Sequence, residues 1–133
     1  MGHPRVLLDS SVVIALLDPH DAHHGSVRPL LEPLRPEDVV ISVLSLAEVM
    51  VGAFARGGPE VKVADDFLRA AAGRVEPVTQ AIARRGARLR ASHRGLRLTD
   101  ALIIATGEEL RVETMLTADA RWRSVSGLIE VVG

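Results

Sequence analysis

Residues 5–17 read Arg-Val-Leu-Leu-Asp-Ser-Ser-Val-Val-Ile-Ala-Leu-Leu, and this stretch indicates the class of fold. Residues 5–9 form a short, almost continuously apolar run of the kind that makes a buried strand, and the run closes on Asp9. A second apolar run at residues 12–17 predicts a helix directly after it. A buried strand that passes through a polar junction into a helix is typical of an α/β unit.

The same alternation continues along the chain. We expect further strands at residues 39–42, 75–78, 114–117 and 128–132, and helices at 21–34, 44–56, 60–72, 79–93 and 99–110. Pro29 and Pro33 should kink or split the first of these helices, and Thr99 should cap the last. Strands that alternate with helices imply a parallel sheet covered on both faces. The prediction is a single three-layer α/β/α domain over residues 1–133, with a central, mainly parallel sheet.

Composition excludes several classes of function. The chain has no cysteine, so it has neither a thiolate metal site nor a cysteine nucleophile. Its aromatic residues are Phe54, Phe67 and Trp122, too few for a platform that stacks single-stranded bases. No apolar run approaches the roughly 18 residues of a membrane span. We therefore expect a soluble, cytoplasmic protein.

The net charge of −1 conceals an uneven distribution of charge. Between Pro77 and Thr99 the chain carries no acid but six arginines, namely Arg84, Arg85, Arg88, Arg90, Arg94 and Arg97. This arginine block has two interpretations. It is an RNA-facing surface, with Arg84, Arg85 and Arg88 as the contacts, or it is a solvated helix face whose charges pair with acids elsewhere.

Four acids stand at junctions between the expected elements: Asp9, Glu48, Asp100 and Asp119. Each has a structural explanation on its own, such as a capping box between Ser45 and Glu48. At least three of them should emerge at or near one edge of the sheet, where the carboxyl ends of parallel strands collect. Four carboxylates there repel one another, and neither the single lysine nor the arginine block is adjacent to them. We therefore expect a divalent cation among them.

The types of ligand select the metal and the reaction. Oxygen donors without cysteine favour Mg²⁺ or Mn²⁺ over zinc. One ion with bound water, or two ions about 3.5–4 Å apart, would both suit four carboxylates. The natural reaction of such a site is attack of activated water on a phosphodiester.

Four segments resemble the PIN-domain family, and within it the VapC-type toxins of bacterial toxin–antitoxin modules. The segments are Val6-Leu-Leu-Asp9-Ser-Ser, Ser45-Leu-Ala-Glu48-Val, Leu98-Thr-Asp100-Ala-Leu-Ile-Ile-Ala105 and Leu116-Thr-Ala-Asp119-Ala-Arg-Trp122. They follow the family's order and intervals over essentially the whole chain. Trp122 stands where many relatives carry phenylalanine, a departure that we expect to affect packing alone.

The resemblance implies both a function and a set of site residues. Asp9, Glu48, Asp100 and Asp119 would be the catalytic, metal-binding acids, and the hydroxyls of Ser10 and Thr117 would orient water and the acid cluster. The protein would be a Mg²⁺-dependent (or Mn²⁺-dependent) endoribonuclease that cuts structured RNA such as tRNA or rRNA and inhibits translation.

The resemblance also implies partners. The chain would form a homodimer held by a small VapB-like antitoxin, which blocks the site and binds operator DNA. The apolar helix at residues 44–54 is either a buried core helix or the dimer or antitoxin surface.

Two alternatives complete the analysis. The chain could be a non-catalytic PIN-like module that binds RNA or a partner through residues 84–97. His20, His23 and His24 are close in sequence, but we interpret them as surface histidines rather than metal ligands because no third ligand is evident.

Overall fold

The computed structural model describes residues 5–133. Five strands, β1 to β5, span Val6–Leu8, Val39–Ser42, Arg74–Glu76, Thr114–Thr117 and Ile129–Val131. Six helices, α1 to α6, span Ser10–Leu17, His24–Leu31, Val43–Arg56, Gly58–Ala71, Gln80–Ser92 and Leu98–Glu109. Two 3₁₀ turns, η1 and η2, lie at Pro36–Asp38 and Ala120–Trp122. No helix in this described part of the chain is both long enough and apolar enough to span a membrane.

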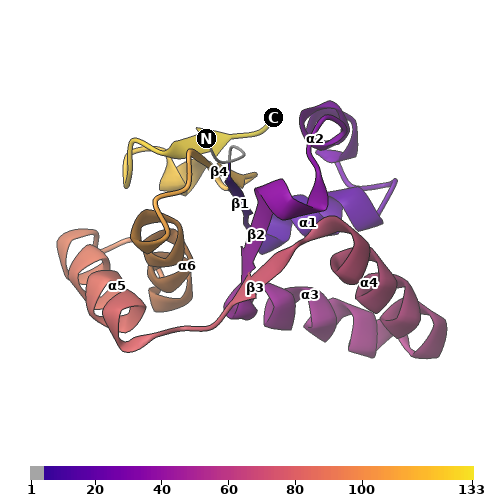
Figure 1. Ribbon diagram of the computed structural model, residues 1–133, viewed down its shortest axis with the longest axis horizontal. Helices are drawn as coiled ribbons and strands as arrows, with labels where there is room; N and C mark the ends of the chain where they lie inside the picture. Colours follow the sequence, from indigo (N-terminus) through magenta and orange to yellow (C-terminus); the bar gives the residue numbers. More distant parts are fainter. Residues whose placement is uncertain (1–4) are drawn as a thin grey trace.

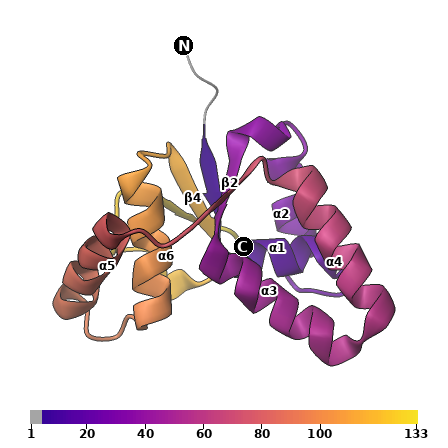
Figure 2. The same cartoon turned by 60° about the horizontal axis from the view of Figure 1, so that its bottom comes forward.

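The strands form one parallel sheet in the order β3-β2-β1-β4-β5, which confirms the predicted α/β class. Helices α5 and α6 cover one face and α1 to α4 cover the other (Figures 1 and 2). Along β1 the side chains alternate between these two layers. Leu8 packs with α1 to α4, whereas Leu7 packs with residues of α6 and with Trp122.

The strand order places the functional edge of the sheet. From β1 the chain moves outward to β2 and β3, and it then returns across the sheet to add β4 on the other side of β1. In open α/β sheets, ligands bind beyond the carboxyl ends of the strands at such a reversal. The amide of Asp9 donates to the carbonyl of Leu116 over 2.9 Å, which ties the ends of β1 and β4 together.

Three local expectations are wrong at particular residues. The helix expected over residues 21–34 is only His24–Leu31, because the Asp21 carboxylate accepts from the amide of His23 in a turn before it. Pro29 lies inside this helix and does not end it. Helix α6 begins one residue before Thr99, with Arg97 at the N-cap position and no side-chain cap.

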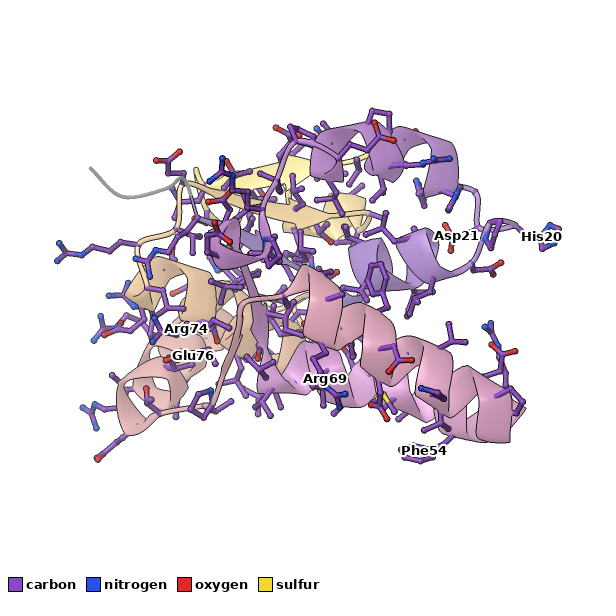
Figure 3. All side chains as sticks on the ribbon, turned by 45° about the vertical axis from the view of Figure 1, so that its right-hand side comes forward. His20, Asp21, Phe54, Arg69, Arg74 and Glu76 are labelled. Atoms are coloured by element: carbon purple, nitrogen blue, oxygen red, sulfur yellow. The ribbon has the colours of Figure 1, made fainter. Side chains whose placement is uncertain are left out.

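Helices α3 and α4 meet at a tight corner. Helix α3 ends at Arg56, Gly57 has a φ of 104°, and α4 begins at the next residue. Glycine adopts this left-handed conformation without the Cβ clash that other residues meet. The corner leaves Phe54, near the end of α3, projecting from the body of the protein (Figure 3). Phe54 and Val51 are 66% and 70% exposed, whereas Val49 and Met50 are buried, so this apolar helix has both a core face and an open face.

We predict opposite effects of alanine at two glycines. A Cβ on Gly73, between α4 and β3, would lie 2.5 Å from the backbone carbonyl oxygen of Pro36, which already accepts the Gly73 amide. Because the backbone must shift, Gly73→Ala should destabilise the fold by about 1–3 kcal/mol. Gly52 in α3 has open space around it, so Gly52→Ala should stabilise the fold by roughly 0.5–1 kcal/mol. Urea denaturation of both variants measures the two effects, and equal effects would contradict the prediction.

Candidate active site

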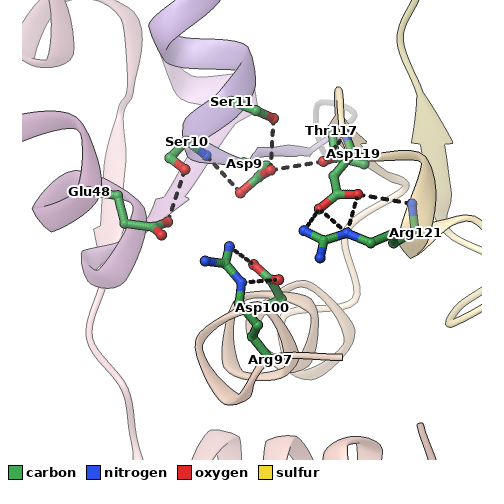
Figure 4. Close-up of polar contacts among 9 residues, drawn as sticks. All are labelled: Asp9, Ser10, Ser11, Glu48, Arg97, Asp100, Thr117, Asp119 and Arg121. Carbon is green, nitrogen blue, oxygen red and sulfur yellow. Dashed lines mark hydrogen bonds and ion pairs between the residues drawn. The ribbon is translucent and has the colours of Figure 1, made fainter. Parts of the chain in front are cut away.

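The fold brings the four predicted acids to one place, beyond the carboxyl ends of β1 and β4. Asp9 follows β1, Glu48 lies in α3, Asp100 opens α6 and Asp119 follows β4. Figure 4 shows the four side chains facing a common space. Their charges are close enough to interact, since the negative charge of Asp100 contributes to a raised pKa of Asp9.

Asp9 is buried, with an exposed fraction of 5%, and hydroxyl and amide donors contact both of its carboxylate oxygens. One carboxylate oxygen, Oδ1, accepts from the amide of Ser10 over 2.8 Å. The other, Oδ2, accepts from the hydroxyls of Ser11 and Thr117, each over 2.8 Å. Burial raises the pKa of Asp9, and these hydrogen bonds offset the effect only in part.

Glu48 is held by a residue from another element. The hydroxyl of Ser10 donates to Glu48 Oε1 over 2.9 Å, so Ser10 contacts Asp9 through its amide and Glu48 through its side chain. The structural alternative for Glu48, a capping box with Ser45, is not formed. Ser42 caps α3 instead, by accepting from the amide of Leu44.

The hydroxyls around Asp9 are themselves held in position by backbone amides. Thr117 Oγ1 accepts from the amide of Asp119 over 3.0 Å, and Ser11 Oγ accepts from the amide of Ala118 over 3.0 Å. Each oxygen is thus left with its proton directed at Asp9. Ser10 and Thr117 were predicted as orienting hydroxyls from the sequence, whereas Ser11 was not. The one sequence signal for Ser11 is that it lies two residues after Asp9, in the first turn of α1.

Two arginines contact Asp100 and Asp119: Arg97, from the arginine block that we expected to lie apart from the acids in sequence, and Arg121, which lies outside that block. Arg97 Nε and Nη2 donate to Asp100 over 3.0 and 3.2 Å. Arg121 Nη2 donates to Asp119 over 2.6 Å, and its Nε contacts both carboxylate oxygens. Hydrogen bonding to Arg121 lowers the pKa of Asp119, and the pKa of each arginine is raised. Arg97 lies three residues before Asp100 and Arg121 two residues after Asp119, and these short spacings are the sequence signal for both pairs.

The donor chemistry fits a hard divalent cation. All four acids offer carboxylate oxygens, the ligands that Mg²⁺ and Mn²⁺ prefer. Within residues 5–133, Asp9 and Glu48 are contacted by hydroxyl or amide donors and by no cationic side chain within ion-pair distance. The buried carboxylate of Asp9 therefore has no compensating positive charge. Among the described residues, no group of three or more acids or histidines lies close enough together to hold one metal ion.

The arginine block divides into two parts. Arg85 Nε donates to Glu109 over 2.7 Å, and its Nη1 lies 3.6 Å from Glu108. These contacts lie at the opposite end of α6 from Asp100. For Arg85 they support the interpretation of a solvated helix face whose charges pair with acids elsewhere. Arg84 and Arg88 are exposed on α5. His24, in the histidine group, lies outside the acid cluster, with its Nδ1 at 2.7 Å from the carbonyl oxygen of Ala15.

Comparisons with known proteins agree with the geometry. A sequence profile described as the PIN domain matches residues 6–128. The fold is similar to that of VapC20 from Mycobacterium tuberculosis, described as a sarcin-ricin loop cleaving toxin (23% identity, TM-score 0.79, covering 96% of this chain and 99% of that one). It is also similar to VapBC-5 of the same organism (26%, 0.65, 97% and 98%) and to DNA-bound VapBC from Salmonella typhimurium (18%, 0.75, 97% and 98%). No curated protein sequence matches the chain.

Proposed function

Because the chain belongs to the PIN-domain family, we propose that it acts as a VapC-type toxin, an endoribonuclease that depends on a divalent metal ion. One observation carries the proposal. Four carboxylates from four separate elements converge at the reversal point of the sheet, around a buried Asp9 that has neutral hydrogen-bond donors and no counter-ion among the described side chains. Asp9 and Asp119 also cap α1 and η2, but capping does not explain why four carboxylates lie together.

The site residues have distinct proposed roles. Asp9, Glu48, Asp100 and Asp119 would hold Mg²⁺ or Mn²⁺. Such a cation, when bound, supplies activated water near neutral pH and neutralises charge on the leaving oxygen. Ser10, Ser11 and Thr117 orient the carboxylates through the hydrogen bonds described above, as outer partners of metal ligands commonly do.

The proposed substrate is a structured RNA such as tRNA or rRNA, whose cleavage would inhibit translation in the cytoplasm. The fold relative VapC20 is described as cleaving the sarcin-ricin loop. Arg84 and Arg88 lie exposed on α5 and would extend the RNA contact electrostatically, whereas Arg85 is engaged by Glu108 and Glu109.

The proposed partners are a second copy of the chain and a VapB-like antitoxin. A groove of about 130 Å³ runs between α1, α3 and α4, with Ile14, Val49 and Val63 in its lining. The exposed Phe54 lies on the same helix as Val49. Open apolar surface of this kind marks an interaction site. Since similar VapBC structures include one bound to DNA, we propose that operator DNA is bound only through the antitoxin.

Cleavage of total RNA by the purified, partner-free chain tests the proposal. Discrete fragments should form in Mg²⁺ or Mn²⁺ and not in EDTA. The variant Glu48→Gln should lose this cleavage, whereas Glu113→Gln, at an exposed acid before β4, should keep it. RNA that binds the folded chain and stays intact would support the non-catalytic module in place of the nuclease.

Thr117→Val is expected to slow cleavage by about 10–100-fold, the usual effect of removing an outer partner of a metal ligand. The substitution preserves shape but removes the hydroxyl that donates to Asp9 and accepts from the amide of Asp119. Thr106→Val is the matched control, because the equally buried Thr106 hydroxyl bonds only within its own helix, to the carbonyl of Leu102. Equal rates for the two variants, measured on one labelled RNA, would contradict the positioning role.

A further inference from the structure

Arg97 and Arg121 occupy the carboxylates that a metal ion would need. Two guanidinium nitrogens of Arg97 donate hydrogen bonds to Asp100. Two guanidinium nitrogens of Arg121 and its backbone amide donate to Asp119. The positive charge of Arg97 also interacts with Glu48 and Asp119, and that of Arg121 with Asp100. Both guanidinium groups therefore interact electrostatically with more than one acid of the site (Figure 4).

We propose that Arg97 and Arg121 are exchangeable counter-ions. They pair with Asp100 and Asp119 while no divalent cation is bound, and they bind RNA phosphates instead once the carboxylates hold a cation. The inference rests on the proposed function. It assigns two arginines that would lower metal affinity in the free protein and raise RNA affinity in the metal-bound protein.

The exchange requires little movement. The side chains of Arg97 and Arg121 are 61% and 63% exposed, whereas those of Asp100 and Asp119 are 6% and 22% exposed. Each arginine thus reaches from solvent onto a more enclosed carboxylate, and rotation of its side chain alone releases it. Because each guanidinium group is largely solvated even in the pair, it loses little on release, and a divalent ion that contacts several carboxylates can displace it.

The released arginines are suited to phosphate. A guanidinium group keeps its charge and donates two parallel hydrogen bonds to phosphate oxygens as it does to a carboxylate. Asp100 and Arg121 line a hollow of about 380 Å³ together with His93, Leu96 and Ser124. RNA that enters this hollow would meet Arg121 directly beside the acids.

Metal binding by the metal-free chain tests the first half of the inference. Binding of Mn²⁺, followed by the electron paramagnetic resonance signal of the free ion, should be about two- to fivefold tighter in Arg97→Gln and in Arg121→Gln than in the wild type. Arg85→Gln is the matched control, since Arg85 forms similar ion pairs with Glu108 and Glu109 outside the site. Its Mn²⁺ affinity should equal that of the wild type.

RNA binding tests the second half. A fluorescent RNA hairpin is titrated with each protein in EDTA and in Ca²⁺, and electrophoresis shows whether the hairpin stays uncut. With Ca²⁺ bound, each Gln variant in the site should lose about one unit of the salt-dependence slope. In EDTA the loss should be smaller, because the carboxylates already neutralise both arginines.

The outcomes separate this inference from the nuclease proposal. If the wild type cuts RNA but the two Gln variants bind Mn²⁺ no more tightly, the counter-ion role is wrong and the nuclease stands. If the variants bind Mn²⁺ more tightly and lose salt-dependence slope in Ca²⁺, but no RNA is cut, the inference stands without the nuclease, whereas an unchanged slope would overturn the phosphate role. If no protein binds Mn²⁺, both are wrong.

Discussion

The substitution Asp9→Asn is expected to lower RNA cleavage by about a thousandfold or more. A divalent cation supplies several kcal/mol of stabilisation to the reaction, and each 1.36 kcal/mol is a factor of ten. Asp9 is one of the two buried carboxylates of the site, and asparagine would remove its charge at almost unchanged size. The rate on a labelled RNA, measured under single-turnover conditions, gives the effect. Asp66→Asn, at an exposed aspartate on α4 paired with Lys62, is the control and should cut at the wild-type rate.

The same substitution should leave the metal-free fold as stable as the wild type, or more stable. Burial raises the pKa of Asp9, so the ionised carboxylate destabilises the folded state at pH values above that pKa. The amide oxygen can still accept from Ser10, and the amide nitrogen can donate to the Ser11 and Thr117 oxygens, each of which already accepts from one backbone amide. The two hydroxyl protons lose Asp9 as an acceptor, which offsets part of the gain.

The pH dependence of unfolding identifies this effect. As pH falls through the raised folded pKa of Asp9 toward its unfolded value, the wild type takes up a proton on folding and loses the burial penalty. The advantage of Asp9→Asn over the wild type should therefore shrink between neutral pH and about pH 4, near the ordinary pKa of an aspartate. Thermal denaturation of both proteins in EDTA measures it. A melting temperature of the variant well below that of the wild type at neutral pH would contradict the prediction.

The largest effect on stability is expected from Trp122→Ala. Trp122 is completely buried and packs with Leu7, Ile103 and Met115 against the α5–α6 face of the sheet. Truncation of such a side chain costs about 3–5 kcal/mol. Since domains are stable by only about 5–15 kcal/mol, a large share of the folding free energy would be lost. Guanidinium denaturation followed by circular dichroism measures the change.

Trp122→Phe separates lost packing from lost hydrogen bonding. Among the residues that the structure describes, Trp122 Nε1 is buried and has no hydrogen-bond partner. A buried, unpaired donor is itself destabilising by about 1–3 kcal/mol, so its removal offsets part of the lost volume. Trp122→Phe should therefore destabilise the fold far less than Trp122→Ala. A similar loss in both variants would mean that the indole nitrogen has a stabilising contact.

The class of fold was predictable from the sequence because its signals are local. The run over residues 5–9 and the four later ones each became a strand of the parallel sheet. The central strands β1 and β2 are buried throughout and almost wholly apolar, as strands covered on both faces must be, whereas the edge strands β3 and β5 are partly exposed and contain charged residues. Local signals failed where two were in competition. Around Asp21 and Pro29, turn chemistry shortened one end of a helix while the proline was accommodated inside it.

The sequence predicted that at least three of Asp9, Glu48, Asp100 and Asp119 lie near one edge of the sheet, because the order of elements determines that the carboxyl ends of parallel strands share an edge. Which donor each acid would meet did not follow. Glu48 accepts from Ser10, 38 residues away, rather than from its own helix, and Asp9 accepts from Thr117, 108 residues away. Local and distant donors offer hydrogen bonds of similar strength, so only tertiary packing decides between them. The pairs Arg97–Asp100 and Arg121–Asp119 are local, and their short spacing is visible in the sequence, whereas tertiary packing alone decides which face of α3 stays open.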